Sequence, residues 1–186
     1  MMDAVLAQAG LIKSDLTHVA YASGPGAFTG VRIATATAQG LAIGLKLPLV
    51  AISSLAVLAQ HASEVCGVDK IVASLDARMG EAYVAHYQKN PATHLVELKG
   101  EERLVKLSYL EGPSDWFLAG SGFKARRDAG MGSSESDLDE QILPHAAALA
   151  VLAKQAIDQG LVVTADLAPI NYIRNKVAEK KKVVTL

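Results

Sequence analysis

Apolar residues in the first third of the chain follow helical and strand-like spacings in turn. Between Met1 and Ala9 they recur at i, i+1, i+4, i+5 and i+8, which places them on one face of a helix that Gly10 ends. The elements predicted next are a strand over 17–23, a helix over 31–46 with Thr29 as N-cap, a strand over 49–52, and a helix from Ser53 or Ser54 to about Glu64. This order is typical of a parallel sheet with crossover helices.

The pattern changes after about residue 68. Two alternating runs, 71–75 and 82–87, flank a polar turn and predict a β-hairpin. Residues 89–115 are polar and mixed and predict no clear element. The remaining predictions are a strand over 116–119, a surface loop over 128–141, a helix over 145–159 and an extended segment over 168–175.

The first helix begins at residue one without an N-cap or a preceding turn. We therefore expect the sequence upstream of it to be missing. A genuine start with a frayed first helix is the alternative.

Composition and charge limit the classes of function. The net charge is −1, so we do not expect the chain to grip a nucleic-acid backbone alone. One cysteine, Cys66, allows no intrachain disulfide, which indicates a reducing compartment such as the cytoplasm. The most apolar stretch, 41–55, is interrupted by Lys46 and Pro48, which argues against a membrane span.

A glycine-rich loop between the first strand and its helix is the most informative motif. Three glycines permit positive φ angles and close approach of another backbone, and a helix N-terminus with an arginine in its first turn attracts anions. The candidate anion-binding or partner-docking residues are Gly24, Pro25, Gly26, Thr29, Gly30 and Arg32. The loop matches neither a Walker motif nor a dinucleotide fingerprint, and a tight structural turn is the alternative interpretation.

The helix after this loop carries small residues on two faces. Ala34, Ala38 and Ala42 lie on one, and Ala36, Gly40 and Gly44 on the other. Small residues let another helix approach closely, either within the domain or at a subunit interface. The predicted interface residues are Ala34, Ala38, Gly40, Leu41, Ala42 and Leu45.

The tip of the predicted hairpin holds Asp76, Arg78 and Glu81. Two carboxylates beside an arginine can serve acid–base chemistry, but we favour a turn-stabilising or binding role. No two of the five histidines are spaced three or four residues apart, and the cysteine stands alone, so we expect no metal site.

Three stretches together resemble the TsaB (YeaZ) family: 23–33 (Ser-Gly-Pro-Gly-Ala-Phe-Thr-Gly-Val-Arg-Ile), 75–83 (Leu-Asp-Ala-Arg-Met-Gly-Glu-Ala-Tyr) and 169–175 (Pro-Ile-Asn-Tyr-Ile-Arg-Asn). The family usually has Ser where Ala27 stands. The resemblance implies an α/β fold of the actin-like ATPase (ASKHA) class with two ribonuclease-H-like subdomains, the first incomplete at its N-terminus because the family's Asp-Thr-Ser strand is missing. The implied division is 1–67, 68–168, and 169–186 as an extended segment with a basic tail.

The same resemblance implies a function. The chain is expected to be a non-catalytic scaffold for TsaD, the paralogue with a His-x-x-x-His metal motif that forms threonylcarbamoyladenosine next to the anticodon of tRNAs. TsaE is a further implied partner, tRNA is contacted only through the complex, and the chain alone is expected to form a homodimer. The hairpin stands where relatives have a phosphate loop, so no cofactor is expected to bind tightly and an adenine nucleotide only weakly. An ATP-dependent phosphotransferase and a glycoprotease-like (M22-type) peptidase are the alternatives.

Overall fold

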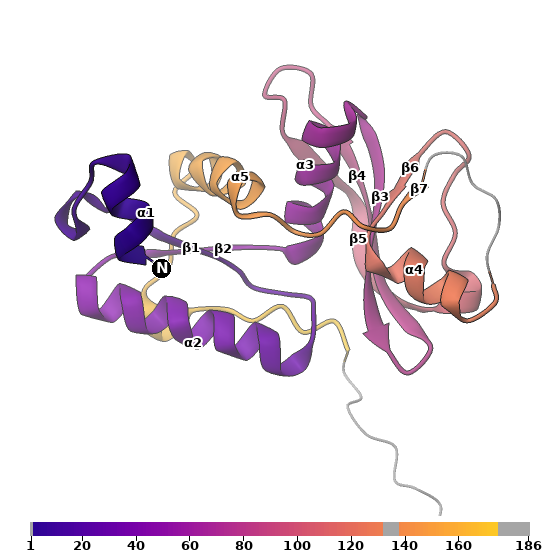
Figure 1. Ribbon diagram of the computed structural model, residues 1–186, viewed down its shortest axis with the longest axis horizontal. Helices are drawn as coiled ribbons and strands as arrows, with labels where there is room; N and C mark the ends of the chain where they lie inside the picture. The colour runs from indigo at the N-terminus through magenta and orange to yellow at the C-terminus, as the bar shows by residue number, and fades with distance from the viewer. Residues whose placement is uncertain (1, 132–137, 175–186) are drawn as a thin grey trace, which may run out of the picture.

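The described residues of this computed structural model, 2–131 and 138–174, form two β-sheets that organise two lobes (Figure 1). In chain order the elements are α1 (Met2–Ala9), η1 (Lys13–Asp15), β1 (Val19–Ala22), α2 (Phe28–Leu45), β2 (Leu49–Ile52), α3 (Ser54–Cys66), β3 (Lys70–Arg78), β4 (Glu81–Lys89), β5 (Val96–Lys106), η2 (Leu107–Tyr109), β6 (Phe117–Ala119), α4 (Ser121–Asp128), β7 (Leu138–Asp139), α5 (Ala146–Asp158) and η3 (Ala165–Leu167).

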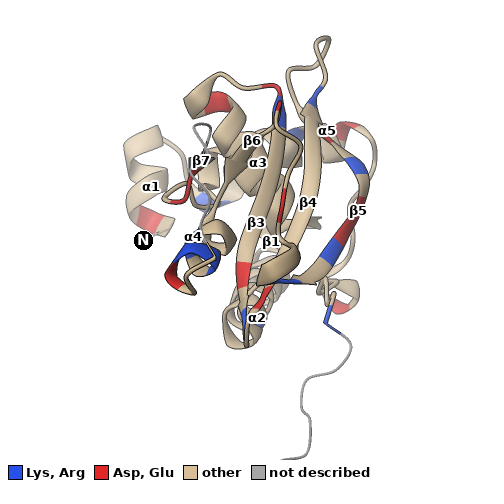
Figure 2. Ribbon diagram, turned by 90° about the vertical axis from the view of Figure 1, so that its right-hand side faces the viewer, with Lys and Arg blue, Asp and Glu red and all other residues tan. Residues whose placement is uncertain are grey.

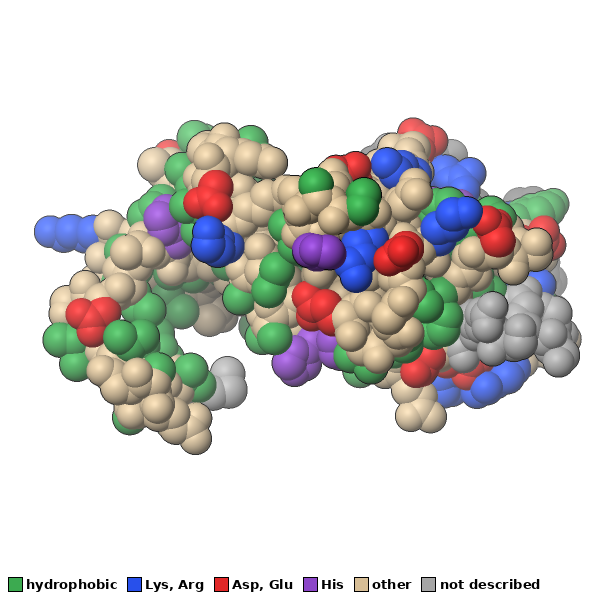
Figure 3. Space-filling model, turned by 90° about the horizontal axis from the view of Figure 1, so that it is seen from above, with side chains coloured by type: hydrophobic (Ala, Val, Ile, Leu, Met, Phe, Trp, Pro, Cys, Tyr) green, Lys and Arg blue, Asp and Glu red, His purple; other side chains and the backbone are tan. Residues whose placement is uncertain are grey.

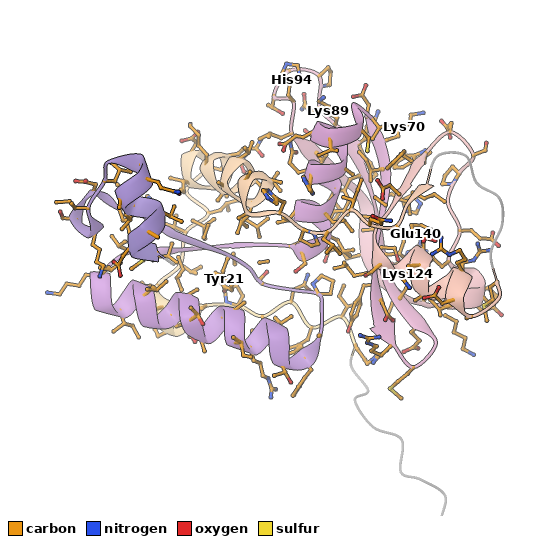
Figure 4. All side chains as sticks on the ribbon, in the orientation of Figure 1. Tyr21, Lys70, Lys89, His94, Lys124 and Glu140 are labelled. Carbon is orange, nitrogen blue, oxygen red and sulfur yellow. The ribbon has the colours of Figure 1, made fainter. Side chains whose placement is uncertain are left out.

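The first lobe is built on the parallel pair β1 and β2, in which Val19 lies opposite Leu49. Helix α2 covers one face of this pair and α5 the other (Figure 1). The core under α2 contains Tyr21, whose side chain lies between β1 and α2 (Figure 4) and whose hydroxyl donates to the Pro169 carbonyl at 2.7 Å. The C-terminal segment is thereby tied to the first sheet.

The second lobe holds five strands in the order β5-β4-β3-β6-β7. Strands β3, β4 and β5 are antiparallel neighbours, while β6 and β7 run parallel to β3. Acidic and basic residues follow one another along the edge strand β5 (Figure 2). Charges on an edge strand discourage pairing with another chain.

The helices pack across the predicted subdomain boundaries. Helix α3, which precedes residue 68, packs on the sheet of the second lobe, whereas α5 packs on β2 of the first lobe. Helix α4 covers the other face of the second sheet (Figure 1). The division of the chain after residues 67 and 168 stays a prediction.

Most predicted elements are confirmed, with four differences, of which the first is helix α4, since no pattern predicted a helix there. Thr29 is not an N-cap, because α2 already begins at Phe28; its N-cap is Ala27, which makes no side-chain capping bond. Ser53 caps α3 through the amides of Leu55 and Ala56, as one of the two alternatives predicted. Residues 89–115, which carried no clear pattern, contain the 11-residue strand β5, and the expected loop over 128–141 contains the short strand β7.

Within the described part of the chain, every helix is too short or too polar to cross a membrane.

Candidate functional site

The three stretches that carry the family resemblance meet around one cavity of about 610 Å³. The loop and first turn of α2 form one wall, the β3–β4 hairpin a second, and the C-terminal segment a third. Among the lining residues are Phe28 and Arg32, Asp76 and Tyr83, and Tyr172 and Arg174. Segments up to about 145 residues apart in sequence therefore build a single site, which lies between the two lobes.

The glycine-rich loop is held tightly from two sides. The Ser54 amide donates to the Gly24 carbonyl at 2.7 Å, and the Asn171 amide donates to the Ser23 carbonyl at 2.8 Å. Gly24 has a φ of +105°, and a Cβ built there would lie 2.9 Å from the Asn171 carbonyl oxygen. Only glycine fits this position, because a side chain would be strained and would collide with backbone.

Arg32 projects from the second turn of α2 over two aromatic rings. Its guanidinium carbon lies 3.6 Å from the centroid of the Phe28 ring, and its Nε donates to the Tyr172 hydroxyl at 2.9 Å. In the described part of the chain Arg32 forms no ion pair with a carboxylate. This arginine is the site's uncompensated positive charge.

The hairpin tip uses its charged residues internally. Arg78, Met79 and Gly80 all have positive φ, and the Asp76 carboxylate accepts from the Arg78 amide at 2.8 Å and pairs with its guanidinium at 2.9 Å. The interpretation of Asp76 and Arg78 as a turn-stabilising pair is confirmed. The opposite carboxylate, Glu81, pairs with Arg174 at 2.5 Å. Both carboxylates of the hairpin tip are therefore held in ion pairs.

A partly buried polar cluster joins the C-terminal segment to both lobes. The Glu102 carboxylate accepts hydrogen bonds from the Ser53 hydroxyl, from the Tyr87 hydroxyl at 2.7 Å and from the Asn171 side chain at 2.6 Å. Burial, with the adjacent Glu102 carboxylate, raises the pKa of the Tyr87 phenol. Tyr87 therefore stays neutral and acts as a donor. This cluster positions the segment that carries Tyr172 and Arg174.

The predicted loop residues divide between cavity and surface. Gly26 and Arg32 line the cavity, Gly24 and Pro25 are buried beneath it, and Thr29 and Gly30 are exposed on the first turn of α2. Asp76 and Arg78 of the hairpin also line it, whereas Glu81 reaches the site only through Arg174.

The predicted interface residues require a correction. Ala38 and Ala42 are 4% and 2% exposed and pack on Tyr21 and Leu49, so they belong to the core. Ala34, Leu41 and Leu45 are half-buried, and Gly40 is exposed. The spacing of small residues correctly indicated two faces of α2. It could not indicate which of the two the sheet covers.

Five residues that contribute to the site were not predicted as site residues: Phe28, Tyr83, Asn171, Tyr172 and Arg174. Three of them lie in the stretch 169–175, so its resemblance to the family was the signal that marked them. Nothing in the local pattern indicates that this segment returns to the glycine-rich loop. The described residues contain no group of three or more His, Cys, Asp or Glu placed to hold a metal ion.

Comparison with known proteins identifies relatives over most of the chain. A family model described as TsaD, tRNA N6-adenosine threonylcarbamoyltransferase, matches residues 1–182. The chain is 38% identical to the tRNA threonylcarbamoyladenosine biosynthesis protein TsaB of Escherichia coli (strain K12), over 97% of this chain and 80% of that protein.

Two solved structures are similar to this one. YeaZ from Pseudomonas aeruginosa has a TM-score of 0.84 at 38% identity, over 92% of this chain and 80% of that chain. A second, described as similar to the peptidase YeaZ from Pseudomonas aeruginosa, has a TM-score of 0.85 at 38% identity, over 94% of this chain and 81% of that chain.

Proposed function

This chain belongs to the TsaB family, also named YeaZ, which acts in the biosynthesis of threonylcarbamoyladenosine in tRNA, and we propose that it is the non-catalytic subunit that supports TsaD there. The resemblance found on the three stretches is confirmed, and with it the actin-like α/β fold. The matching family model is described for TsaD, but this sequence lacks the His-x-x-x-His motif expected of that enzyme.

The exposed face of α2 carries the proposal. Ile33 and Ile43 are 60% and 68% exposed, and with Ala36 and Gly40 they recur at i, i+3, i+7 and i+10. This is the spacing of a seam between two packed helices. Ile side chains left in water on a regular stripe favour burial against a second helix.

The glycines on that face supply a second argument. A Cβ built at Gly40 or Gly44 meets nothing within 4 Å, so no contact with the described residues requires their small size. A glycine in a helix interior costs roughly 1 kcal/mol relative to alanine. Contact with a partner helix would offset this cost, because glycine allows the two helix backbones to approach closely.

The exposed face is wide enough to continue onto the first helix. Helix α1 lies above the C-terminal end of α2 (Figure 1) and exposes Val5, and the turn after it exposes Ile12. We propose that α1 and α2 together form the TsaD-binding surface and the homodimer surface of the isolated chain. One surface cannot serve both pairings at once, so they exclude each other.

The remaining parts of the proposal concern tRNA, nucleotide and further partners. Acidic and basic side chains are interspersed over the face seen in Figure 3, and the net charge is −1, which favours a tRNA contact made through the complex. TsaE as a further partner and a weakly bound adenine nucleotide stay predictions, as does the cytoplasm as location. Asp76 and Glu81 are held in ion pairs, which favours a structural role over peptidase or phosphotransferase chemistry.

The test replaces an exposed alanine by arginine on each of the two helices that cover opposite faces of the first sheet. Ala36→Arg on α2 is expected to lower TsaD binding at least about tenfold and to abolish the homodimer, because it places a charge in the seam. Ala150→Arg, at an exposed position of α5, is the control. Affinity is measured by calorimetry and self-association by analytical ultracentrifugation. Equal loss in both variants, or in neither, places the interface elsewhere.

A further inference from the structure

We propose that the cavity between the glycine-rich loop, the β3–β4 hairpin and the C-terminal segment binds a small aromatic carboxylate, with Arg32 as its counter-ion. This role is separate from the partner surface on α2, because it needs only residues within the chain.

The charges around the cavity define the charge of the ligand. Arg78 is neutralised by Asp76 and Arg174 by Glu81, whereas Arg32 pairs with no carboxylate in the described part of the chain. One uncompensated cation matches a ligand with a single negative charge. A polyphosphate would require several free cations or a metal.

The geometry of Arg32 favours a carboxylate. Its Nε is engaged by the Tyr172 hydroxyl, and the Phe28 ring covers one face of the guanidinium. No described residue accepts a hydrogen bond from its two Nη atoms. Such a planar fork binds the two oxygens of a carboxylate.

The hydroxyl of Tyr83 supplies a second hydrogen-bond donor at the cavity. Tyr83 lines the cavity and is only 8% exposed, yet its hydroxyl has no hydrogen-bond partner among the described residues. Its backbone carbonyl, in contrast, accepts a hydrogen bond from the Ser74 hydroxyl at 3.0 Å. A ligand oxygen in the cavity would accept a hydrogen bond from this hydroxyl.

The apolar part of the cavity favours an aromatic frame. The residues Phe28 and Tyr172 are each 49% exposed, and the centroids of their rings lie 6.4 Å apart. The volume of about 610 Å³ lies within the usual range for small-molecule sites and far exceeds what an inorganic anion needs. Burial of a ligand ring against Phe28 and Tyr172 would remove this aromatic surface from water.

The first experiment titrates the isolated full chain with 2-naphthoate by calorimetry. Acetate keeps the carboxylate without the ring, and 2-naphthalenemethanol keeps the ring without the carboxylate. We expect 2-naphthoate to bind at least about tenfold more tightly than either fragment, since each half contributes. Equal binding of either fragment would overturn the proposal, and so would tighter binding of Mg-ATP, which would indicate a polyanion site.

The second experiment uses variants with matched controls. Arg32→Gln and Tyr83→Phe are each expected to weaken 2-naphthoate binding, Arg32→Gln by about tenfold. Arg103→Gln on β5 and Tyr109→Phe in η2 change exposed residues outside the cavity and are expected to have no effect. Full affinity in folded Arg32→Gln refutes the proposal. Because Arg32 is exposed, this variant decides the outcome even where Tyr83→Phe fails to fold. Neither result depends on whether Ala36→Arg weakens TsaD binding.

Discussion

The Asn171 side chain donates to the Glu102 carboxylate at 2.6 Å, which joins the C-terminal segment to the edge strand of the second sheet across 69 positions of sequence. The same carboxylate accepts from Ser53, the N-cap of α3, and from Tyr87 of β4. One side chain therefore connects four elements that surround the candidate site.

Glu102→Ala is expected to lower the free energy of unfolding by about 1–3 kcal/mol, because it leaves the Tyr87 hydroxyl buried without an acceptor. Urea denaturation followed by circular dichroism measures this change. Glu101→Ala, at the exposed neighbouring position, is the control.

Adding Tyr87→Phe to Glu102→Ala is expected to recover part of the loss, since both partners of the bond are then removed. Strictly additive effects of the two substitutions would contradict a direct coupling between these side chains.

Two glycine-to-alanine substitutions are expected to act in opposite directions. Gly24→Ala lowers stability by roughly 1–2 kcal/mol or more, because alanine is strained at a φ of +105° and its Cβ meets the Asn171 carbonyl. Gly40→Ala raises it by up to about 1 kcal/mol, because the helix gains propensity and the space is open. The melting temperatures of the isolated variants show whether each substitution raises or lowers stability. A loss of stability in isolated Gly40→Ala would contradict the open environment of that glycine.

Ala38→Glu and Ala36→Glu separate the core from the surface of α2. Ala38 is 4% exposed beside Tyr21 and Leu49, so a carboxylate there is buried without a partner and the first lobe is expected to unfold. Ala36 is exposed, and its variant is expected to stay folded. Circular dichroism and limited proteolysis distinguish the two. A folded Ala38→Glu variant would mean that α2 can rotate on the sheet.

Stability is expected to fall as the pH decreases through the range in which histidines titrate. Burial, and then the charge of Arg103, lower the pKa of His86 from its usual value of 6.5. The unfolded chain therefore takes up a proton before the folded chain does, so His86 contributes stability above about pH 6.5 that is lost as the pH falls toward its lowered pKa.

His86→Phe keeps a ring beside Trp116, whose centroid lies 5.2 Å away, and removes the titration. The melting temperature of the variant should change less between about pH 7.5 and about pH 5.5 than that of the parent. Arg103→Gln should reduce the same dependence in part. If the melting temperature of His86→Phe depends on pH as that of the parent does, other groups cause the dependence.

The isolated chain is expected to leave tRNA unmodified when mixed with threonylcarbamoyl adenylate, because the sequence lacks the histidine motif expected of TsaD. Mass spectrometry of the digested tRNA detects modified adenosine. Addition of TsaD and TsaE is the positive control, and modification by the isolated chain would show that it is itself an enzyme.

The sequence by itself determined the local elements and the family. Apolar periodicity located α2, β2, α3 and the β3–β4 hairpin, since these depend on side chains close together in the chain. It did not locate β5, because an exposed edge strand with charged residues on its outer face carries little hydrophobic pattern. Strand β5 forms because it pairs with β4.

Only the tertiary structure decided which residues form the site and which face of α2 is free. The sheet lies under Ala38 and Ala42, so the stripe with Ile33 and Gly40 is left exposed, although both faces carry small residues. Arg32 meets Tyr172 across 140 positions because Glu102 and the Ser23 carbonyl hold Asn171 beside the glycine-rich loop. Contacts of this separation follow from how the lobes pack, and local spacing carries no information about them.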